Sequence, residues 1–198
     1  MSGEARNRPG KRGITVKIAF TALFAALTAA GAFIAIPAGP VPIVLQNFFA
    51  LLSGLVLGPV TGSASVGLYL LAGILGLPVF AGGTGGIARF AGPTGGFLAG
   101  YLLSALVAGL VAGQPGKRAR NNGRLSVVRL IIAVVLGLLI VYVPGVLWLK
   151  ISGNLGWTKA FLAGFVPFIM GDILKGTAAV IIAPRLRRIA ADFLYGAY

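Results

Sequence analysis

The sequence predicts an all-α integral membrane protein with about six transmembrane helices. Of its 198 residues, 58% are hydrophobic and only 10% are charged, whereas a soluble domain carries roughly 25% charged residues. The mean hydropathy is +0.97. The apolar residues also gather in runs close to the ~20 residues that a helix needs to cross a bilayer. This composition could not cover a water-soluble surface, so we expect the chain to lie in a membrane.

Breaks in the apolar pattern divide the chain into a basic tail, residues 1–13, and a single membrane domain, residues 14–198. The spans are expected at residues 14–36, 42–58, 60–76, 93–113, 127–149 and 160–183. The first span ends at Pro37, and Gly58-Pro59 separates the second from the third. The first apolar run is longer than the roughly 7–15 residues of a signal-peptide core, and no A-x-A site leads into a polar domain. We therefore interpret it as a retained helix.

Basic residues predict how the spans are oriented. Thirteen of the 17 lysines and arginines fall in three groups: Arg6, Arg8, Lys11, Arg12, Lys17, Lys117, Arg118, Arg120, Arg124, Arg129, Arg185, Arg187 and Arg188. In a six-span chain these groups share one side, which the positive-inside rule assigns to the cytoplasm. The other side receives only Arg89, Lys150 and Lys159. Both termini are therefore expected in the cytoplasm, and the net charge of +14 indicates orientation rather than nucleic-acid binding.

Several kinds of chemistry are not expected. The sequence has no cysteine and no histidine, which excludes thiol catalysis, histidine bases and Cys/His metal sites. Its three acidic residues, Glu4, Asp172 and Asp192, are too far apart in sequence to suggest a metal cluster or paired-carboxylate catalysis. No G-x-x-x-x-G-K-[ST] phosphate loop is present. We therefore expect neither an enzyme nor a metal or cofactor site.

The pair Asp172 and Lys175 is the most unusual feature of the apolar runs. Even a low estimate for one charge at the centre of a membrane helix is ~2.5–3.5 kcal/mol. At i,i+3 the two side chains share one helix face, about 12 residues into the last expected span and so ~18 Å deep. The pair could be a structural ion pair that fixes helix register or part of a polar ligand site near the midplane, where transporter sites tend to lie.

Three further features could bind a ligand or a partner. The Gly-rich connection at residues 77–92 would let the backbone approach a ligand closely, and Arg89 within it could bind a carboxylate. Gln46 and Asn47 could hydrogen-bond a ligand or a neighbouring helix. Small residues at i, i+4 and i+8 of the first span form a face that suits close helix packing, within this chain or against another subunit: Ala22, Ala26 and Ala30.

Taken together, these motifs resemble the BioY family, the biotin-specific S components of energy-coupling factor (ECF) transporters. The resemblance covers about residues 15–185. Four stretches carry it: Pro42-Ile-Val-Leu-Gln-Asn-Phe48 with Leu57-Gly-Pro-Val-Thr-Gly62, Tyr69-Leu-Leu-Ala-Gly-Ile-Leu-Gly-Leu-Pro-Val-Phe-Ala-Gly-Gly83, Ala91-Gly-Pro-Thr-Gly-Gly-Phe-Leu-Ala-Gly100, and Pro167-Phe-Ile-Met-Gly-Asp-Ile-Leu-Lys175.

The resemblance implies a six-helix S-component fold in a prokaryotic cell membrane. It implies that biotin binds in a pocket open to the outside and covered by the Gly-rich loop. The partners would be a membrane T component, docked on the alanine face of the first span, and two cytoplasmic ATPases. The residues expected to contact biotin are Asp172, Lys175, Arg89, Gln46, Asn47, Tyr69, Phe80, Gly82, Gly83 and Thr84.

Roles within this expected site follow from the chemistry of biotin. Asp172 would accept the ureido N–H groups. Lys175 would donate to the ureido oxygen or hold Asp172 ionised, and Arg89 would steer or clamp the carboxylate. Phe80 and Tyr69 would bury the fused rings. An S component for another vitamin and a membrane packing subunit without a ligand stay open as alternatives.

Overall fold

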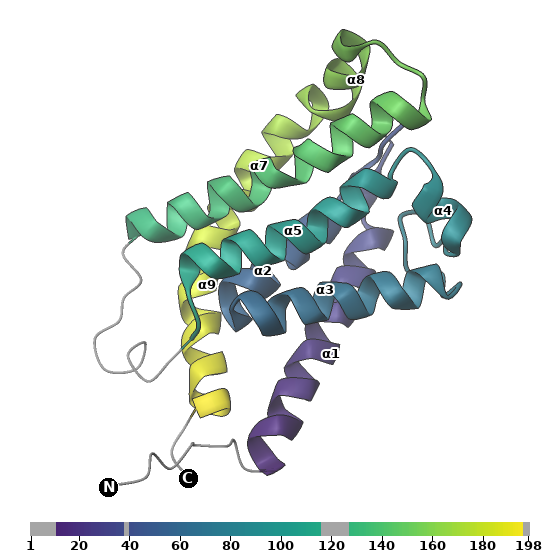
Figure 1. Ribbon diagram of the computed structural model, residues 1–198. Helices are drawn as coiled ribbons and strands as arrows, with labels where there is room; N and C mark the ends of the chain where they lie inside the picture. Colours follow the sequence, from purple (N-terminus) through teal and green to yellow (C-terminus); the bar gives the residue numbers. More distant parts are fainter. Residues whose placement is uncertain (1–10, 38–39, 116–126, 196–198) are drawn as a thin grey trace, which may run out of the picture.

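The computed structural model describes residues 11–37, 40–115 and 127–195, and they form a helical bundle (Figure 1). Its elements are α1 (Lys11–Phe33), β1 (Ala35–Ile36), β2 (Ile43–Val44), α2 (Gln46–Leu57), α3 (Pro59–Ile74), α4 (Ile87–Ala91), α5 (Gly95–Ala112), α7 (Val127–Ser152), α8 (Trp157–Gly164), the 3₁₀ turn η1 (Val166–Phe168) and α9 (Ile169–Tyr195). The start of α1 and the end of α9 lie at one end of the bundle, and α8 lies at the other. The mostly helical fold predicted from the sequence is confirmed.

In the part of the chain that the structure describes, four helical segments are long and apolar enough to cross a membrane: Gly13–Phe33, Gly95–Ala112, Val127–Ser152 and the broken run Trp157–Leu194. α2 and α3 are shorter, and the 12 residues of α2 extend only about 18 Å. The second expected span, 42–58, starts too early, because residues 43 and 44 form a strand and α2 begins at Gln46. The predicted number of crossings and the placement of both termini in the cytoplasm stay predictions.

A small β-hairpin departs from the all-α prediction. β1 and β2 pair antiparallel, with Ala35 opposite Val44 and Ile36 opposite Ile43. Prolines 37, 40 and 42 interrupt the helical pattern between α1 and α2, because proline donates no backbone hydrogen bond and restricts the residue before it to extended conformations. The segment therefore turns back over the bundle as a hairpin instead of continuing either helix.

The last expected span, 160–183, is not one continuous helix. α8 ends at Gly164, the 3₁₀ turn Val166–Phe168 contains Pro167, and α9 then runs to Tyr195. Asp172 consequently lies in the first turn of α9, not 12 residues into a helix. The depth of ~18 Å assumed an unbroken helix and stays a prediction.

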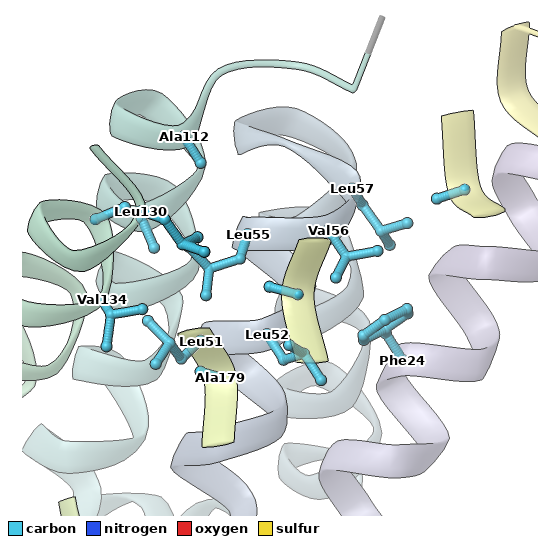
Figure 2. Packing of buried hydrophobic residues seen from close by; sticks show 14 of the residues in the cluster. Phe24, Leu51, Leu52, Leu55, Val56, Leu57, Ala112, Leu130, Val134 and Ala179 are labelled. Carbon is cyan, nitrogen blue, oxygen red and sulfur yellow. The ribbon is translucent and has the colours of Figure 1, made fainter. Parts of the chain in front are cut away.

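α2 lies at the centre of the bundle, and almost all of its residues are buried. Leu51, Leu52 and Leu55 pack among side chains from α1, α5, α7 and α9 (Figure 2). Gly54 allows α5 to approach α2 closely, because a Cβ atom there would lie 2.1 Å from the carbonyl oxygen of Ala105 on α5. Small residues at such crossings are typical of membrane helix packing. The result is a rigid central helix that presents its N-terminal residues at one end of the bundle.

Candidate functional site

The polar residues at the first turn of α9 form one hydrogen-bonded cluster. Asp172 Oδ1 accepts hydrogen bonds from Asn47 Nδ2 at 3.0 Å and from Lys175 Nζ at 3.2 Å, and Asp172 Oδ2 accepts from the Tyr142 hydroxyl. Lys175 Nζ also donates to Asn47 Oδ1 at 2.9 Å. The side chains of Asp172 and Lys175 are each only 10% exposed. α2, α7 and α9 therefore each contribute a polar group to one buried site.

Local structure favours a carboxylate at this point. The first turn of a helix carries unpaired N–H groups and the positive end of the helix dipole, which stabilise a negative charge there. Asn47 is held opposite because α2 begins where the hairpin ends, with the Leu45 N–H donating to Gly31 O and Ile34 O at 3.2 Å. The break before α9 and the hairpin before α2 thus bring the two helix starts together.

The cluster keeps hydrogen-bonding capacity for a ligand. A carboxylate offers about four acceptor positions and an ammonium three donors. Among the described residues, Asp172 accepts three hydrogen bonds, which leaves one position on Oδ2 open. Within the same residues Lys175 donates two, which leaves one N–H open. The cluster can therefore bind a neutral group that presents an N–H donor beside a carbonyl acceptor.

A second polar contact, between Gln46 and Tyr69, lies next to the residues that line the cavities. The Gln46 amide donates to the Tyr69 hydroxyl, and the rings of Tyr69 and Phe80 meet edge to face with centroids 5.7 Å apart. All three side chains are buried. Thr84 pairs with Phe80 across an isolated bridge and donates its hydroxyl to Ala81 O at 3.1 Å. The Gly-rich loop is thus folded onto the helices rather than extended into solvent.

Glycine is required at the tip of this loop. Gly82 and Gly83 have φ values of +76° and +68°, in the left-handed region where a Cβ atom is unfavourable. They make the tight turn that returns the chain from Phe80 to Thr84. Gly82 is exposed and Gly83 is half-buried, so the structure places them at the turn rather than among the cavity-lining residues.

The hairpin covers the cluster. Val41 and Val44 are buried, and with Pro42 they line two cavities of about 20 Å³ each. Phe97 and Tyr101 of α5 line both cavities as well, Gln46 and Phe80 line one, and Asn47 and Lys175 line the other. Each volume is sufficient for about one water molecule, whereas small-molecule sites usually measure ~300–1,000 Å³. A larger ligand therefore needs this lining to move, and the hairpin contributes Val41, Pro42 and Val44 to both cavities.

A larger hollow lies on the other side of Tyr142. It is a lateral groove of about 480 Å³ between α7 and α9, and its polar side chains are Tyr142, Asp172 and Thr177. The remaining lining residues, such as Leu138 and Ile173, are apolar apart from Gly176. The groove suits a hydrocarbon chain better than a polar vitamin, so the site under the hairpin is the better candidate for a polar ligand.

Most of the predicted site residues lie in the Asp172 cluster or beside the two small cavities under the hairpin, but not all of them do. Arg89 lies on α4, half-buried, and its Nε has no hydrogen-bond partner in the described part of the chain. Arg89 lines neither small cavity. Its expected role toward a carboxylate stays a prediction that depends on movement of the covering segments.

The sequence reasoning missed Tyr142 and the aromatic residues around it. The Tyr142 ring packs against Phe165 at 4.6 Å and Phe97 at 6.4 Å between centroids. The available signal was a single phenol in the apolar run Leu138-Leu-Ile-Val-Tyr-Val-Pro144. It was weak, because the spacing does not reveal that α7 faces the start of α9. The hairpin residues Val41, Pro42 and Val44 carried no signal, because apolar residues and proline are common in membrane segments.

A family model and several named proteins match the sequence of this chain. The family model described as "BioY family" matches residues 4–192. A probable biotin transporter BioY from Pyrococcus horikoshii is 44% identical over 171 residues, covering 86% of this chain and 96% of that protein. The biotin transporter BioY of Thermotoga maritima is 41% identical, with coverages of 86% and 95%.

A solved structure agrees in fold. The crystal structure of an S-component for biotin from an ECF-type ABC transporter superposes with a TM-score of 0.80 at 30% identity. The match covers 91% of this chain and 95% of that one.

Proposed function

The chain belongs to the BioY family, and from this premise we propose that it is the substrate-binding membrane subunit for biotin uptake in an ECF transporter. The relatives named as biotin transporters and the solved S-component for biotin support this function. The protein would be a multi-pass protein of a prokaryotic cell membrane. It would capture biotin from outside and release it to the cytoplasm together with a T component and ATPases.

One observation carries the choice of ligand within the site. Among the described residues Asp172 keeps one acceptor position and Lys175 one N–H, and their side chains meet at 3.2 Å in the cluster. The ureido ring of biotin presents an N–H beside a carbonyl, so one edge of the ring can satisfy both groups. Phe97, Tyr101 and Phe80 line the cavities and would bury the fused rings. We assign the ureido group to Asp172 and Lys175 on this basis, and the valerate carboxylate to Arg89.

The direct test is labelled-biotin binding to the detergent-purified chain, run beside thiamine and riboflavin. Saturable binding of biotin alone supports the proposed function. Tighter binding of another vitamin would favour the related alternative of a different S component. Binding of none of them would favour a packing subunit without a ligand. As a substrate-binding subunit the chain would act by binding, not catalysis, and would need no cofactor of its own.

Locking the hairpin should block binding. A Cβ atom at Gly171 would lie 3.7 Å from Cγ2 of Ile43, which is one bond away from the Cβ atom of Ile43. Cysteines at these two positions are therefore near enough to test for a disulfide, whose Cβ atoms lie about 3.5–4.5 Å apart. The chain contains no other cysteine. We expect the oxidised Ile43→Cys/Gly171→Cys variant to lose biotin binding, because the hairpin can no longer leave the cavities. The same sample after reduction is the control and should recover binding. Full binding in the oxidised form would contradict a covering role.

The alanine face of α1 is the proposed docking surface for the T component. Ala22, Ala26 and Ala30 are exposed, whereas Phe24 and Thr28 on the same helix face inward. We expect Ala26→Trp to abolish co-purification with the T component and leave biotin binding unchanged, because the larger ring prevents close helix contact. Leu136→Trp, at an exposed position on α7, is the matched control. Equal co-purification of both variants would remove α1 from the interface.

A further inference from the structure

Two arginines donate hydrogen bonds to backbone carbonyl groups near the ends of α2 and α5. A proline four residues later leaves each of these carbonyls without its usual backbone N–H donor. In a continuous helix the carbonyl of Leu55 would accept from the N–H of residue 59, and that of Val111 from residue 115. Both of these residues are proline and have no N–H. Arg187 Nη1 donates to Leu55 O, and Arg129 Nε donates to Val111 O at 2.5 Å. The guanidinium groups thus replace the missing backbone donors.

Arg187 does more than cap one helix. Its Nη2 donates to Ala112 O at 3.0 Å and to Gly113 O at 2.6 Å, so one side chain on α9 binds the C-terminal ends of both α2 and α5. Arg187 is only 5% exposed. The negative ends of two helix dipoles meet at its positive charge. Leu55 and Ala112 also belong to one packed apolar cluster (Figure 2).

The three helices joined here are also three of those that build the ligand site. α2 provides Gln46 and Asn47, and α5 provides Phe97 and Tyr101. α9 provides Lys175 to one cavity and Asp172 to the hydrogen-bonded cluster beside it. Arg187 follows Asp172 by 15 residues on the same helix, about 22 Å along its axis. A helix that slides or tilts at one end moves its other end as well.

We propose that Arg187 is a positioning residue for ligand binding, which fixes the axial positions of α2, α5 and α9 so that Asn47, Tyr101 and Asp172 converge at the opposite end. The inference rests on the proposed function for its ligand, and it names a residue that never touches that ligand. Displacements near 1 Å at a recognition site can cost on the order of 100-fold.

The chain offers a close control for this role. Arg188 is the next residue on α9 and is exposed, so Arg188→Met removes the same charge without removing the helix contacts. Arg187→Met removes both. Arg187→Lys keeps the charge and donors but cannot span the two helix ends in the same way. We expect biotin affinity to fall at least ~10-fold in Arg187→Met and less in Arg187→Lys, and to stay unchanged in Arg188→Met.

A ligand-free readout separates this inference from the proposed function. Spin labels can be attached to the variants Leu103→Cys on α5 and Met170→Cys on α9, because both positions are exposed. The labelling is specific because the chain has no cysteine of its own. The distance distribution between the two labels should shift or broaden with Arg187→Met, or with Arg187→Lys if the methionine variant does not fold, and not with Arg188→Met. If the parent chain fails to bind biotin, the proposed function is wrong, while the distances still test the positioning. Unchanged distances and affinity with a lower Tm would reduce Arg187 to a purely stabilising residue and overturn the inference.

Discussion

Replacing Asp172 with asparagine is expected to weaken biotin binding by about 100-fold or more. The change removes the charge that Lys175 faces at 3.2 Å and one of the oxygens that accept hydrogen bonds in the cluster. Removing one member of a buried, hydrogen-bonded charge pair costs about 2–5 kcal/mol, and 1.4 kcal/mol corresponds to tenfold in affinity. Equilibrium binding of labelled biotin to the purified variant measures the effect. Asp192→Asn, at an exposed position on the same helix, is the control and should bind as the parent does.

A double variant distinguishes a ligand role from a structural ion pair. Asp172→Asn alone leaves the ammonium of Lys175 buried without its counter-charge, which is destabilising. Adding Lys175→Met removes that charge, so the thermal stability should recover in part. Biotin binding should not recover, because both groups assigned to the ureido ring are gone. If the double variant binds biotin with the parent affinity, the pair serves only to fix packing.

Gly54→Ala is expected to give a large loss of stability. The added methyl group would lie 2.1 Å from the carbonyl oxygen of Ala105 and 2.8 Å from its Cα. These are backbone atoms, so α5 must move away from α2 as a whole. Overpacking of this kind usually costs about 1–3 kcal/mol, and a rigid backbone neighbour puts this site at ~3 kcal/mol or above. A thermal-shift measurement in detergent should show a clearly lower Tm.

Gly67→Ala is the matched control for this substitution. Gly67 lies inside α3, and no atom outside its own helix lies within 4 Å of the position of the new Cβ. Alanine is favoured over glycine in a helix interior by roughly 0.5–1 kcal/mol, so this variant should be as stable as the parent or slightly more stable. Similar losses for both glycines would show that the effect comes from helix propensity and not from the contact with Ala105.

The fold class and the polar pair could be predicted from the sequence because both are properties of composition along the chain. Apolar runs separated by proline, glycine and basic segments indicate membrane helices. A carboxylate and an ammonium at i,i+3 within such a run indicate a shared polar face. The family resemblance predicted Gln46, Asn47, Asp172 and Lys175 as ligand contacts. Asn47 hydrogen-bonds both Asp172 and Lys175, and the contacts with a ligand stay predictions.

The boundaries of the helices were less predictable where a short strand or turn replaces helix within an apolar run. Residues 43 and 44 are apolar and suit a helix, yet they pair with Ala35 and Ile36 as a hairpin. Their conformation depends on the return of the chain over α5, which is a contact between segments far apart in the sequence. The break at Phe165 was equally hidden, because Phe165, Val166 and Phe168 continue the apolar pattern through it.

The sequence by itself determined the membrane-embedded helical class, the buried charged pair and the family. Only the tertiary structure decided which groups surround that pair. Tyr142 joins Asp172 from α7, the hairpin closes over the cluster, and Arg187 supplies the donors that Pro59 cannot. The physical reason is that composition and local spacing describe what one helix can bury, whereas hydrogen-bond partners from other helices depend on how those helices are packed together.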